Sequence, residues 1–431
     1  MHINKLELYL RRLTPILVPA LHIVILFTAY ELLVLSGFIT RIDPFLLKQW
    51  DACWYADIAE HGYRFSALQQ SNTAFFPLFP YIWKLLWKLT GTGITGICIY
   101  NLSMFTAGML ILKKAFNFSW AYFLLFASVP SNMFIYVPYS EATFFFFSSL
   151  ILAGLKTQRT QLLVTGLFFA SLARPSAAFF IPAIILMELL HFGNRRDFVK
   201  RLLCYCAAPV TAILLIFLFQ YRSTGVWLAF FKDGRSRVAH LPEFPLTTWE
   251  GLKNLWLDGL ALFFGILAAV VLVVLLVRKL RSPATVHPEK ALVFSLVYAA
   301  MAVITILLFG VRDAEGGSSL LSLNRFVMAT PYFTVILYFL SHHIEINIRT
   351  YSVYTAVALF TLSLVNLKGT AGKEYTAVDQ FFYGLLLLGS MLLFPAISLQ
   401  YKQRLIAMMY LIGVFAQVLI LHRFNHGMWI G

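Results

Sequence analysis

Long runs of apolar residues, separated by short charged segments, recur along the whole sequence. About 20 apolar residues in a helix are enough to cross the hydrocarbon core of a membrane. Of the 431 residues, 60% are hydrophobic and only 12% are charged, about half the charged fraction that is typical of soluble domains. The pattern therefore predicts an all-α polytopic membrane protein.

We predict thirteen candidate spans and a bundle of about 11 to 13 transmembrane helices, because prolines interrupt some of the runs. Pro130, Pro175 and Pro182 can divide their runs into half-helices, or make residues 160–191 one kinked element. The loops are too short to fold alone, so we expect residues 1–431 to form a single transmembrane domain. The candidate spans are residues 15–38, 94–112, 116–133, 138–156, 160–173, 176–191, 202–221, 257–277, 290–310, 326–341, 350–367, 379–399 and 405–422.

Charged residues are distributed unevenly between the two sides of these spans. With the N-terminus in the cytoplasm, the cytoplasmic side carries 18 of the 34 Lys and Arg residues but only five of the 19 Asp and Glu residues. Basic residues collect in cytoplasmic loops, which supports this orientation. We therefore interpret the net charge of +15 as a topology signal and expect no nucleic-acid partner. The long loops at residues 40–93 and 222–256 then lie on the non-cytoplasmic side, where we expect the functional site.

The first long loop contains a candidate base. If residues 46–60 are helical, Trp50 and Trp54 lie on an apolar face that suits an interfacial helix, and Asp51 lies at the border of that face. A partly desolvated carboxylate can take a proton from an acceptor hydroxyl. The alternative is that Asp51 is an ordinary solvated residue. Asp57 lies on the opposite border, so the two acids do not form a glycosidase-type pair on one helix face.

The same loop continues with an aromatic segment, AFFPLFP, that contains Phe76 and Pro77. Two prolines in this segment predict a rigid, non-helical crossing. It is either a wall for a lipid tail or an interfacial aromatic belt. His61 has no second ligand at metal spacing, and the four cysteines show no ligand pattern, so we expect no metal and no cofactor.

Two charged residues are expected at outer helix ends with little loop around them. Glu141 begins a span in VPYSEATFFFF, where an acid is either functional or a helix-terminal charge that complements the macrodipole. Arg174, in LARPSA, is a candidate ligand for an anion or a buried partner for Glu141 or Asp51.

Further basic residues on the outer side are candidates for binding a lipid phosphate, since Arg and Lys form charge-assisted bonds with it. They are Lys232, Arg235 and Arg237 in the second long loop and Arg325 in LSLNRFVMATP. The alternative for the loop is headgroup anchoring without catalysis. The alternative for Arg325 is an ion pair with Glu141 or Asp313.

Several segments of the sequence resemble one family in order along the chain. WDACWYADIAEHGY followed by AFFPLFP resembles the first lumenal loop of the PIG-V family of GPI mannosyltransferases, which belong to the GT-C class of polytopic glycosyltransferases. SVPSNMFIYVPYSEATF, ASLARPSA and LNRF also match motifs of that family in register. The first of these three contains Tyr139 and Glu141.

The resemblance implies a GT-C bundle with interfacial helices in the first outer loop. It implies inverting transfer of mannose from a polyprenyl phosphate carrier of the dolichyl type to a hydroxyl of a lipid-linked acceptor on the non-cytoplasmic face. By motif position, Asp51 would be the base, and Arg174 and Arg325 would bind the carrier phosphate. The residues expected to shape the site or contact the acceptor are Trp50, Trp54, Asp57, His61, Phe76, Pro77, Tyr139 and Glu141.

The sequence leaves the compartment and the exact role open. The outer loops contain no Asn-x-Ser/Thr acceptor, which favours a bacterial cytoplasmic membrane over the endoplasmic reticulum membrane. A bacterial acceptor would be another glycolipid, a polysaccharide or a protein. The competing functions are a lipid or glycolipid flippase and a non-catalytic subunit of a glycosylation complex. A transporter would more often carry charges at the bilayer midplane and show repeated halves, which this sequence lacks.

Overall fold

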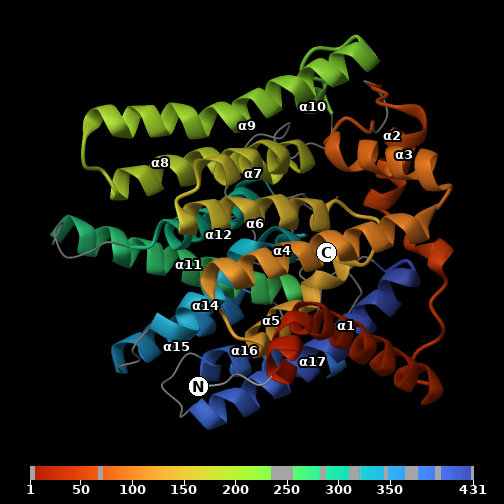
Figure 1. Ribbon diagram of the computed structural model, residues 1–431, viewed down its shortest axis with the longest axis vertical. Helices are drawn as coiled ribbons and strands as arrows, with labels where there is room; N and C mark the ends of the chain where they lie inside the picture. Colours follow the sequence, from red (N-terminus) through yellow and green to blue (C-terminus); the bar gives the residue numbers. More distant parts are fainter. Residues whose placement is uncertain are drawn as a thin grey trace.

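The computed structural model describes residues 5–66, 71–233, 256–281, 288–309, 320, 322–343, 348–364, 377–393 and 399–428. Within these ranges the regular elements are helices, and most of them run side by side in one bundle (Figure 1). The α-helices are α1 (Lys5–Leu35), α2 (Asp51–His61), α3 (Leu78–Thr90), α4 (Ile94–Phe116), α5 (Trp120–Ala127), α6 (Glu141–Thr157), α7 (Thr160–Ala173), α8 (Phe180–Leu190), α9 (Arg195–Thr224), α10 (Ala229–Lys232), α11 (Trp256–Arg281), α12 (Lys290–Leu308), α13 (Leu323–Val327), α14 (Pro331–His343), α15 (Ile348–Leu364), α16 (Ala377–Leu393) and α17 (Leu399–Asn425). Short 3₁₀ helices are η1 (Pro44–Leu47), η2 (Pro130–Ile135) and η3 (Pro175–Phe179).

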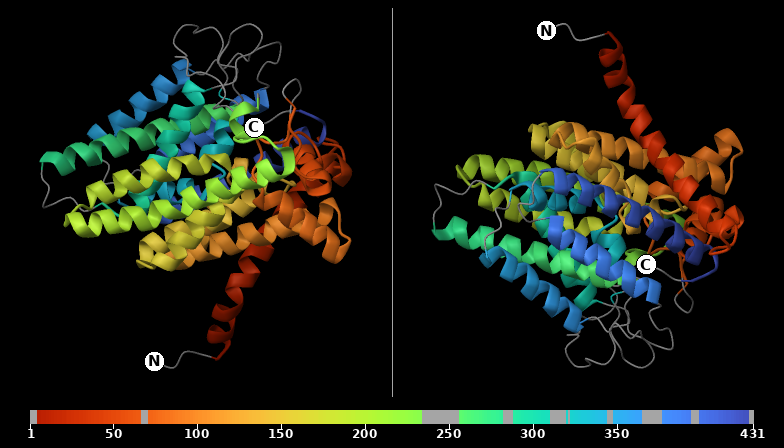
Figure 2. Two further views of the ribbon diagram at one scale, coloured as in Figure 1. Left: turned by 90° about the horizontal axis from the view of Figure 1, so that it is seen from above. Right: turned by 90° about the horizontal axis from the view of Figure 1, so that it is seen from below.

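Six of the described helices are long and apolar enough to cross a membrane: α1, α4, α9, α11, α12 and α17. A helix satisfies all its backbone hydrogen bonds internally, which is why apolar runs of this length become helices in lipid. The prediction of an all-α polytopic membrane protein is confirmed. Figure 2 shows that α1 leaves the bundle at its N-terminal end, while α2 and α3 lie together at the end of the bundle where α1 finishes.

The prediction that residues 116–133 form one membrane-spanning helix is wrong. Helix α4 continues to Phe116, and Asn117 then adopts a left-handed conformation that ends it. The following helix, α5, has only eight residues, or about 12 Å at 1.5 Å per residue. Pro130 then starts η2, because a proline fits the first position of a helical turn but not its interior.

Residues 160–191, predicted as two short spans or one kinked element, form two separate helices that run in opposite directions. Arg174 is extended between α7 and η3, with φ of −149°. Lys156, just before α7, pairs with Glu289 at 2.9 Å, and Glu188, near the end of α8, pairs with Lys290 at 3.0 Å. Because Glu289 and Lys290 are neighbours, α7 begins and α8 ends at the same end of the bundle. Arg174 lies at the opposite end.

The first long loop differs from the predicted continuous helix over residues 46–60. It forms η1, a short break, and then α2, which begins at Asp51. Trp50 therefore lies outside the helix, and Asp51 lies at its N-terminus instead of on the border of an apolar stripe. Helix α3 begins at Leu78, so the aromatic segment is partly helical; Pro80 lies in its first turn, where no backbone N–H is needed.

Helices α6 and α7 approach closely because a glycine lies between them. A Cβ atom at Gly166 would lie 2.6 Å from the backbone oxygen of Phe147 and 2.7 Å from the backbone nitrogen of Ile151. Small residues allow such close packing of helices in membranes. This contact fixes α7, and with it Arg174, against α6.

Gly166→Ala should lower the melting temperature of the purified protein, because the added methyl group meets backbone atoms that cannot move aside. Overpacking of this kind costs about 1 to 3 kcal/mol. Gly384→Ala in α16 is the matched control, since a Cβ atom there meets nothing within 4 Å. The control should be neutral or slightly stabilising. Equal melting temperatures for the two variants would contradict the close α6–α7 contact.

Candidate active site

Four charged side chains meet in one ion-pair cluster. Nη1 of Arg325 lies 2.8 Å from Oδ2 of Asp51, and its Nε and Nη2 both lie 2.6 Å from Oε1 of Glu141. Nη1 of Arg174 lies 2.7 Å from the same oxygen of Glu141. The structure therefore brings together four residues that the sequence predicted for the site, and we call these four the charge cluster.

The charge cluster is assembled from segments far apart in the sequence. Asp51 and Glu141 are the first residues of α2 and α6, where a negative charge complements the helix dipole. Arg174 lies in the extended link after α7, and Arg325 lies in the short helix α13. The suggestions that Arg174 pairs with Glu141 and that Arg325 pairs with Glu141 agree with these contacts.

Aromatic rings enclose the two guanidinium groups. The guanidinium carbon of Arg325 lies 4.7 Å from the ring centre of Tyr139 and 5.0 Å from that of Phe134. That of Arg174 lies 5.0 Å from the ring centre of Phe326. Cations are attracted to the faces of aromatic rings at such distances. The rings also limit how far the guanidinium of Arg325 can move.

Burial and charge act in opposite directions on Arg325. Burial alone would lower the pKa of its guanidinium, but the carboxylates of Glu141 and Asp51 outweigh burial and hold this pKa above its ordinary value. Arg325 is therefore a permanent cation. It is tolerated inside the protein because anions surround it.

Only one member of the charge cluster is appreciably exposed. The side chain of Asp51 is 24% exposed, compared with 5% for Arg325, 6% for Arg174 and 0% for Glu141. The charge cluster is therefore open to solvent on the side of Asp51. Among the four, Asp51 is the group that an acceptor hydroxyl could meet first.

The backbone before Asp51 is strained. Trp50 has φ of 53° and ψ of −117°, which side-chain-bearing residues rarely adopt. Such conformations cost about 1 to 3 kcal/mol and persist where the surrounding structure enforces them. Here the turn places Asp51 at the start of α2, opposite Arg325.

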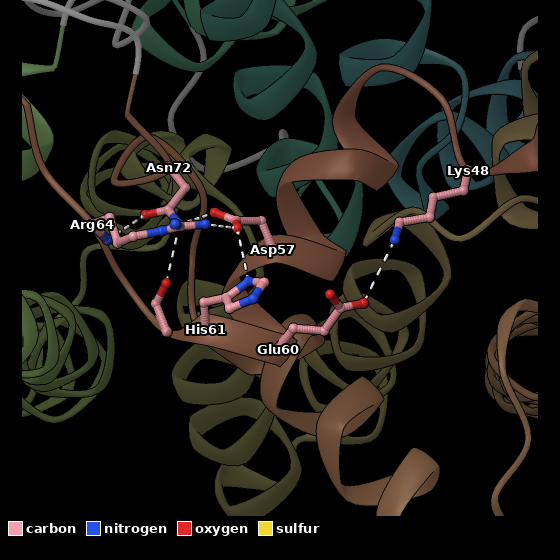
Figure 3. Close-up of polar contacts among 7 residues, drawn as sticks. Lys48, Asp57, Glu60, His61, Arg64 and Asn72 are labelled. Carbon is pink, nitrogen blue, oxygen red and sulfur yellow. Dashed lines mark hydrogen bonds and ion pairs between the residues drawn. The ribbon is translucent and has the colours of Figure 1, made fainter.

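Asp57 belongs to a separate polar group on the exposed side of α2 (Figure 3). Its carboxylate pairs with Arg64, accepts a hydrogen bond from Nδ2 of Asn72 at 2.7 Å, and lies 3.1 Å from Nδ1 of His61. Asn72 also donates to the backbone oxygen of Gly62. This group fixes the course of the first long loop after α2, and the structure does not bring Asp57 or His61 into contact with Asp51.

Of the aromatic candidates of the first long loop, Trp50 is 43% exposed, whereas Trp54 and Phe76 pack against other rings. Trp54 stacks on Phe75 with ring centres 6.3 Å apart, and Phe76 packs edge-on against Phe230 at 5.4 Å. Pro77 is buried and precedes α3. Phe76 thus fills the contact between this loop and α10, and the proposed lipid-tail wall stays a prediction.

Only the first part of the second long loop, up to Asp233, lies within the described residues. Lys232 is exposed at the end of α10, while Arg235, Arg237 and Asp313 lie outside the described residues. The carboxylate of Asp233 accepts hydrogen bonds from the hydroxyls of Ser71 and Thr73 at 2.5 and 2.7 Å, which joins α10 to the first long loop.

Comparisons with known proteins identify the fold. No protein-family model matches the chain. GPI alpha-1,6-mannosyltransferase 2 of Rattus norvegicus is 29% identical over 206 residues, which cover 41% of the chain and only 40% of that relative. ArnT from Cupriavidus metallidurans, in a crystal structure with undecaprenyl phosphate, has 12% sequence identity and superposes with a TM-score of 0.51 over 96% of this chain and 77% of ArnT. The chain has the GT-C glycosyltransferase fold.

The predicted GT-C bundle is therefore confirmed, and the chain is similar in sequence to a GT-C mannosyltransferase. The charge cluster lies at the end of this GT-C bundle where α2 and α3 lie. Within the described residues, no three His, Cys, Asp or Glu side chains could hold a metal ion together.

One residue pair that supports the site was not predicted from the sequence. Asp258 in α11 is completely buried and accepts hydrogen bonds from the backbone N–H and the side-chain Nδ2 of Asn324, at 2.9 and 2.8 Å. These bonds fix the start of α13, and therefore the position of Arg325. The sequence signal that could have found Asp258 is its place inside a predicted span, because an acid at membrane depth usually has a specific role.

Glu141→Gln should destabilise the protein markedly, because Arg174 and Arg325 would lose the buried anion that they share. Breaking a buried pair costs about 3 to 5 kcal/mol. The measurement is the melting temperature in detergent without any substrate. Glu60→Gln is the control, since Glu60 forms only a half-exposed 3.5 Å pair with Lys48. An unchanged melting temperature for Glu141→Gln would mean that the charge cluster does not hold the helix ends together.

Proposed function

We propose that the protein is an inverting glycosyltransferase that moves mannose from a polyprenyl phosphate carrier to a hydroxyl group of a lipid-linked acceptor. The charge cluster is the observation that carries this proposal. It offers a partly exposed carboxylate for the acceptor hydroxyl and two guanidinium groups for the carrier phosphate. The partial similarity to GPI alpha-1,6-mannosyltransferase 2 supports mannose as the sugar. The ArnT structure with undecaprenyl phosphate supports a polyprenyl phosphate carrier.

The reaction follows from the roles of these groups. The acceptor hydroxyl attacks the anomeric carbon of the sugar and gives its proton to Asp51. The bond between the anomeric carbon and the phosphate oxygen breaks, and its electron pair leaves with polyprenyl phosphate. The product is a glycoside with inverted configuration, and Asp51 then releases its proton to solvent.

Fixed cations stabilise the leaving group. The negative charge on the phosphate grows from about one to about two units as the bond to the anomeric carbon breaks. Guanidinium groups that are already oriented stabilise such developing charge without rearranging. Arg325 is the better placed of the two, because it is the one that contacts the exposed carboxylate. Glu141 is a positioning residue, since it holds both arginines.

Asp51→Asn should lower turnover by about 10² to 10⁴, the usual loss on removal of a general base. The amide keeps the shape of the carboxylate but cannot accept the proton. The assay uses purified protein, radiolabelled polyprenyl phosphate mannose and a panel of glycolipid acceptors. Glu60→Gln, an equivalent change on the same helix, should transfer normally.

The outcomes of this assay separate the competing functions. A wild-type protein that transfers no mannose to any acceptor, yet moves lipid across liposome membranes, would support the flippase. Transfer at the wild-type rate by a folded Asp51→Asn protein would remove Asp51 from the mechanism. Transfer that requires an added partner protein and proceeds equally well with Asp51→Asn would support the role of a non-catalytic subunit.

We also propose that the charge cluster faces the non-cytoplasmic side. Cys53 is exposed on α2, near Asp51, and Lys200 is exposed in α9 near its basic start. In intact cells, a membrane-impermeant maleimide should label a variant that keeps only Cys53. A cysteine-free protein with Lys200→Cys should be labelled only after the cells are opened. The reverse pattern would contradict the orientation and leave the reaction itself unaffected.

A further inference from the structure

We propose that the phosphate of the donor displaces Asp51 from Arg325, so that Asp51 becomes available as the base only after the donor has bound. This inference rests on the proposed function and adds a regulatory step to it. Arg325 would couple donor binding to the release of Asp51, and Glu141 would keep Arg325 in place while its other partner changes.

The two carboxylates hold Arg325 in different ways. Glu141 accepts from Nε and Nη2 along one edge of the guanidinium, whereas the ion pair with Asp51 joins Nη1 to Oδ2. The rings of Phe134 and Tyr139 lie against the guanidinium and restrain it further. Because Arg325 is anchored to Glu141 along one edge and lies against two rings, Asp51 is the partner that can leave.

Exposure distinguishes the same two carboxylates. Glu141 is fully buried, so removing its cations would leave an isolated charge inside the protein at high cost. Asp51 is 24% exposed and lies at a helix N-terminus, where solvent and the helix dipole can stabilise its charge. The exchangeable anion is therefore the one at the surface, on the side from which a substrate arrives.

The charge balance of the cluster favours an exchange over a simple addition. Two arginines and two acids sum to zero, and a sugar-bearing polyprenyl phosphate adds one negative charge. An anion gains little from a neutral cluster unless it takes over a cation that a carboxylate held before. Arg binds phosphate well, because its planar group can form parallel bonds to two oxygens. Phosphate oxygens would thus replace Oδ2 of Asp51 at Nη1.

The exchange explains how one arginine can serve both a carboxylate and a phosphate. Before donor binding, Oδ2 of Asp51 is engaged by Nη1 and is not free to receive the proton of a hydroxyl group. After the exchange, both oxygens of Asp51 are available beside the bound donor. No atom other than the hydroxyl proton needs to move to Asp51 during the transfer itself.

The test measures carrier binding instead of activity. The dissociation constant of undecaprenyl phosphate is determined by calorimetry for the purified wild type, Asp51→Asn, Glu60→Gln and the double variant Asp51→Asn with Arg325→Lys. Removing the competing charge of Asp51 should tighten binding by about tenfold or more, since close charge pairs are coupled by at least that factor. Glu60→Gln should bind like the wild type. The double variant should lose the gain, because a lysine cannot reproduce the planar contact.

Binding of the carrier by Asp51→Asn that is equal to or weaker than that of the wild type would overturn the exchange and leave the proposed transfer intact. The same gain in affinity for the double variant would also overturn the exchange, because the gain would then not depend on the guanidinium of Arg325. No binding of undecaprenyl phosphate by the wild type would overturn the proposed carrier and the exchange together. Melting temperatures of all four proteins show that the comparison is made between folded proteins.

Discussion

The buried guanidinium of Arg325 is the constraint on which the rest of this end of the bundle depends. A cation inside a membrane protein is costly unless anions and polar groups surround it. Glu141 and Asp51 provide the anions, and they come from α6 and α2. Because Glu141 also holds Arg174, the same interaction fixes the link between α7 and η3. The proposed binding site and the ion pairs that join four distant segments are therefore one feature.

Much of the helical bundle could be predicted from hydropathy, because an apolar run in lipid has almost no alternative to a helix. The prediction failed where the chain departs from regular helix. Residues 116–133 are apolar throughout, but they form α5 and η2, since hydropathy does not reveal where a chain reverses. The left-handed backbone of Trp50 likewise has no sequence signal, because that conformation normally favours glycine or asparagine.

The residues of the candidate site could be predicted from the sequence better than the contacts among them. The sequence predicts Glu141, Arg174 and Arg325 at outer helix ends and Asp51 on the border of an apolar helix face, with pairing among them as one alternative. Their actual arrangement depends on Asp258, whose bonds to Asn324 position α13, and no local pattern links these two residues. From the sequence alone, an ion pair and a phosphate contact are alternatives for Arg325. In the proposed exchange, Arg325 makes both contacts at different stages.

A protein that binds an anionic lipid carrier through arginines, as we propose here, must keep those cations inside an apolar bundle. Two uncompensated arginines would repel each other and destabilise the empty site. The carboxylates of the charge cluster balance the two arginines, but a fully buried pair could not exchange its partner at acceptable cost. Placing one acid in the interior and the other at the surface satisfies both demands. In the proposed exchange, Glu141 provides lasting stability, and Asp51 is the anion that the donor phosphate replaces and that then accepts the proton of the acceptor hydroxyl.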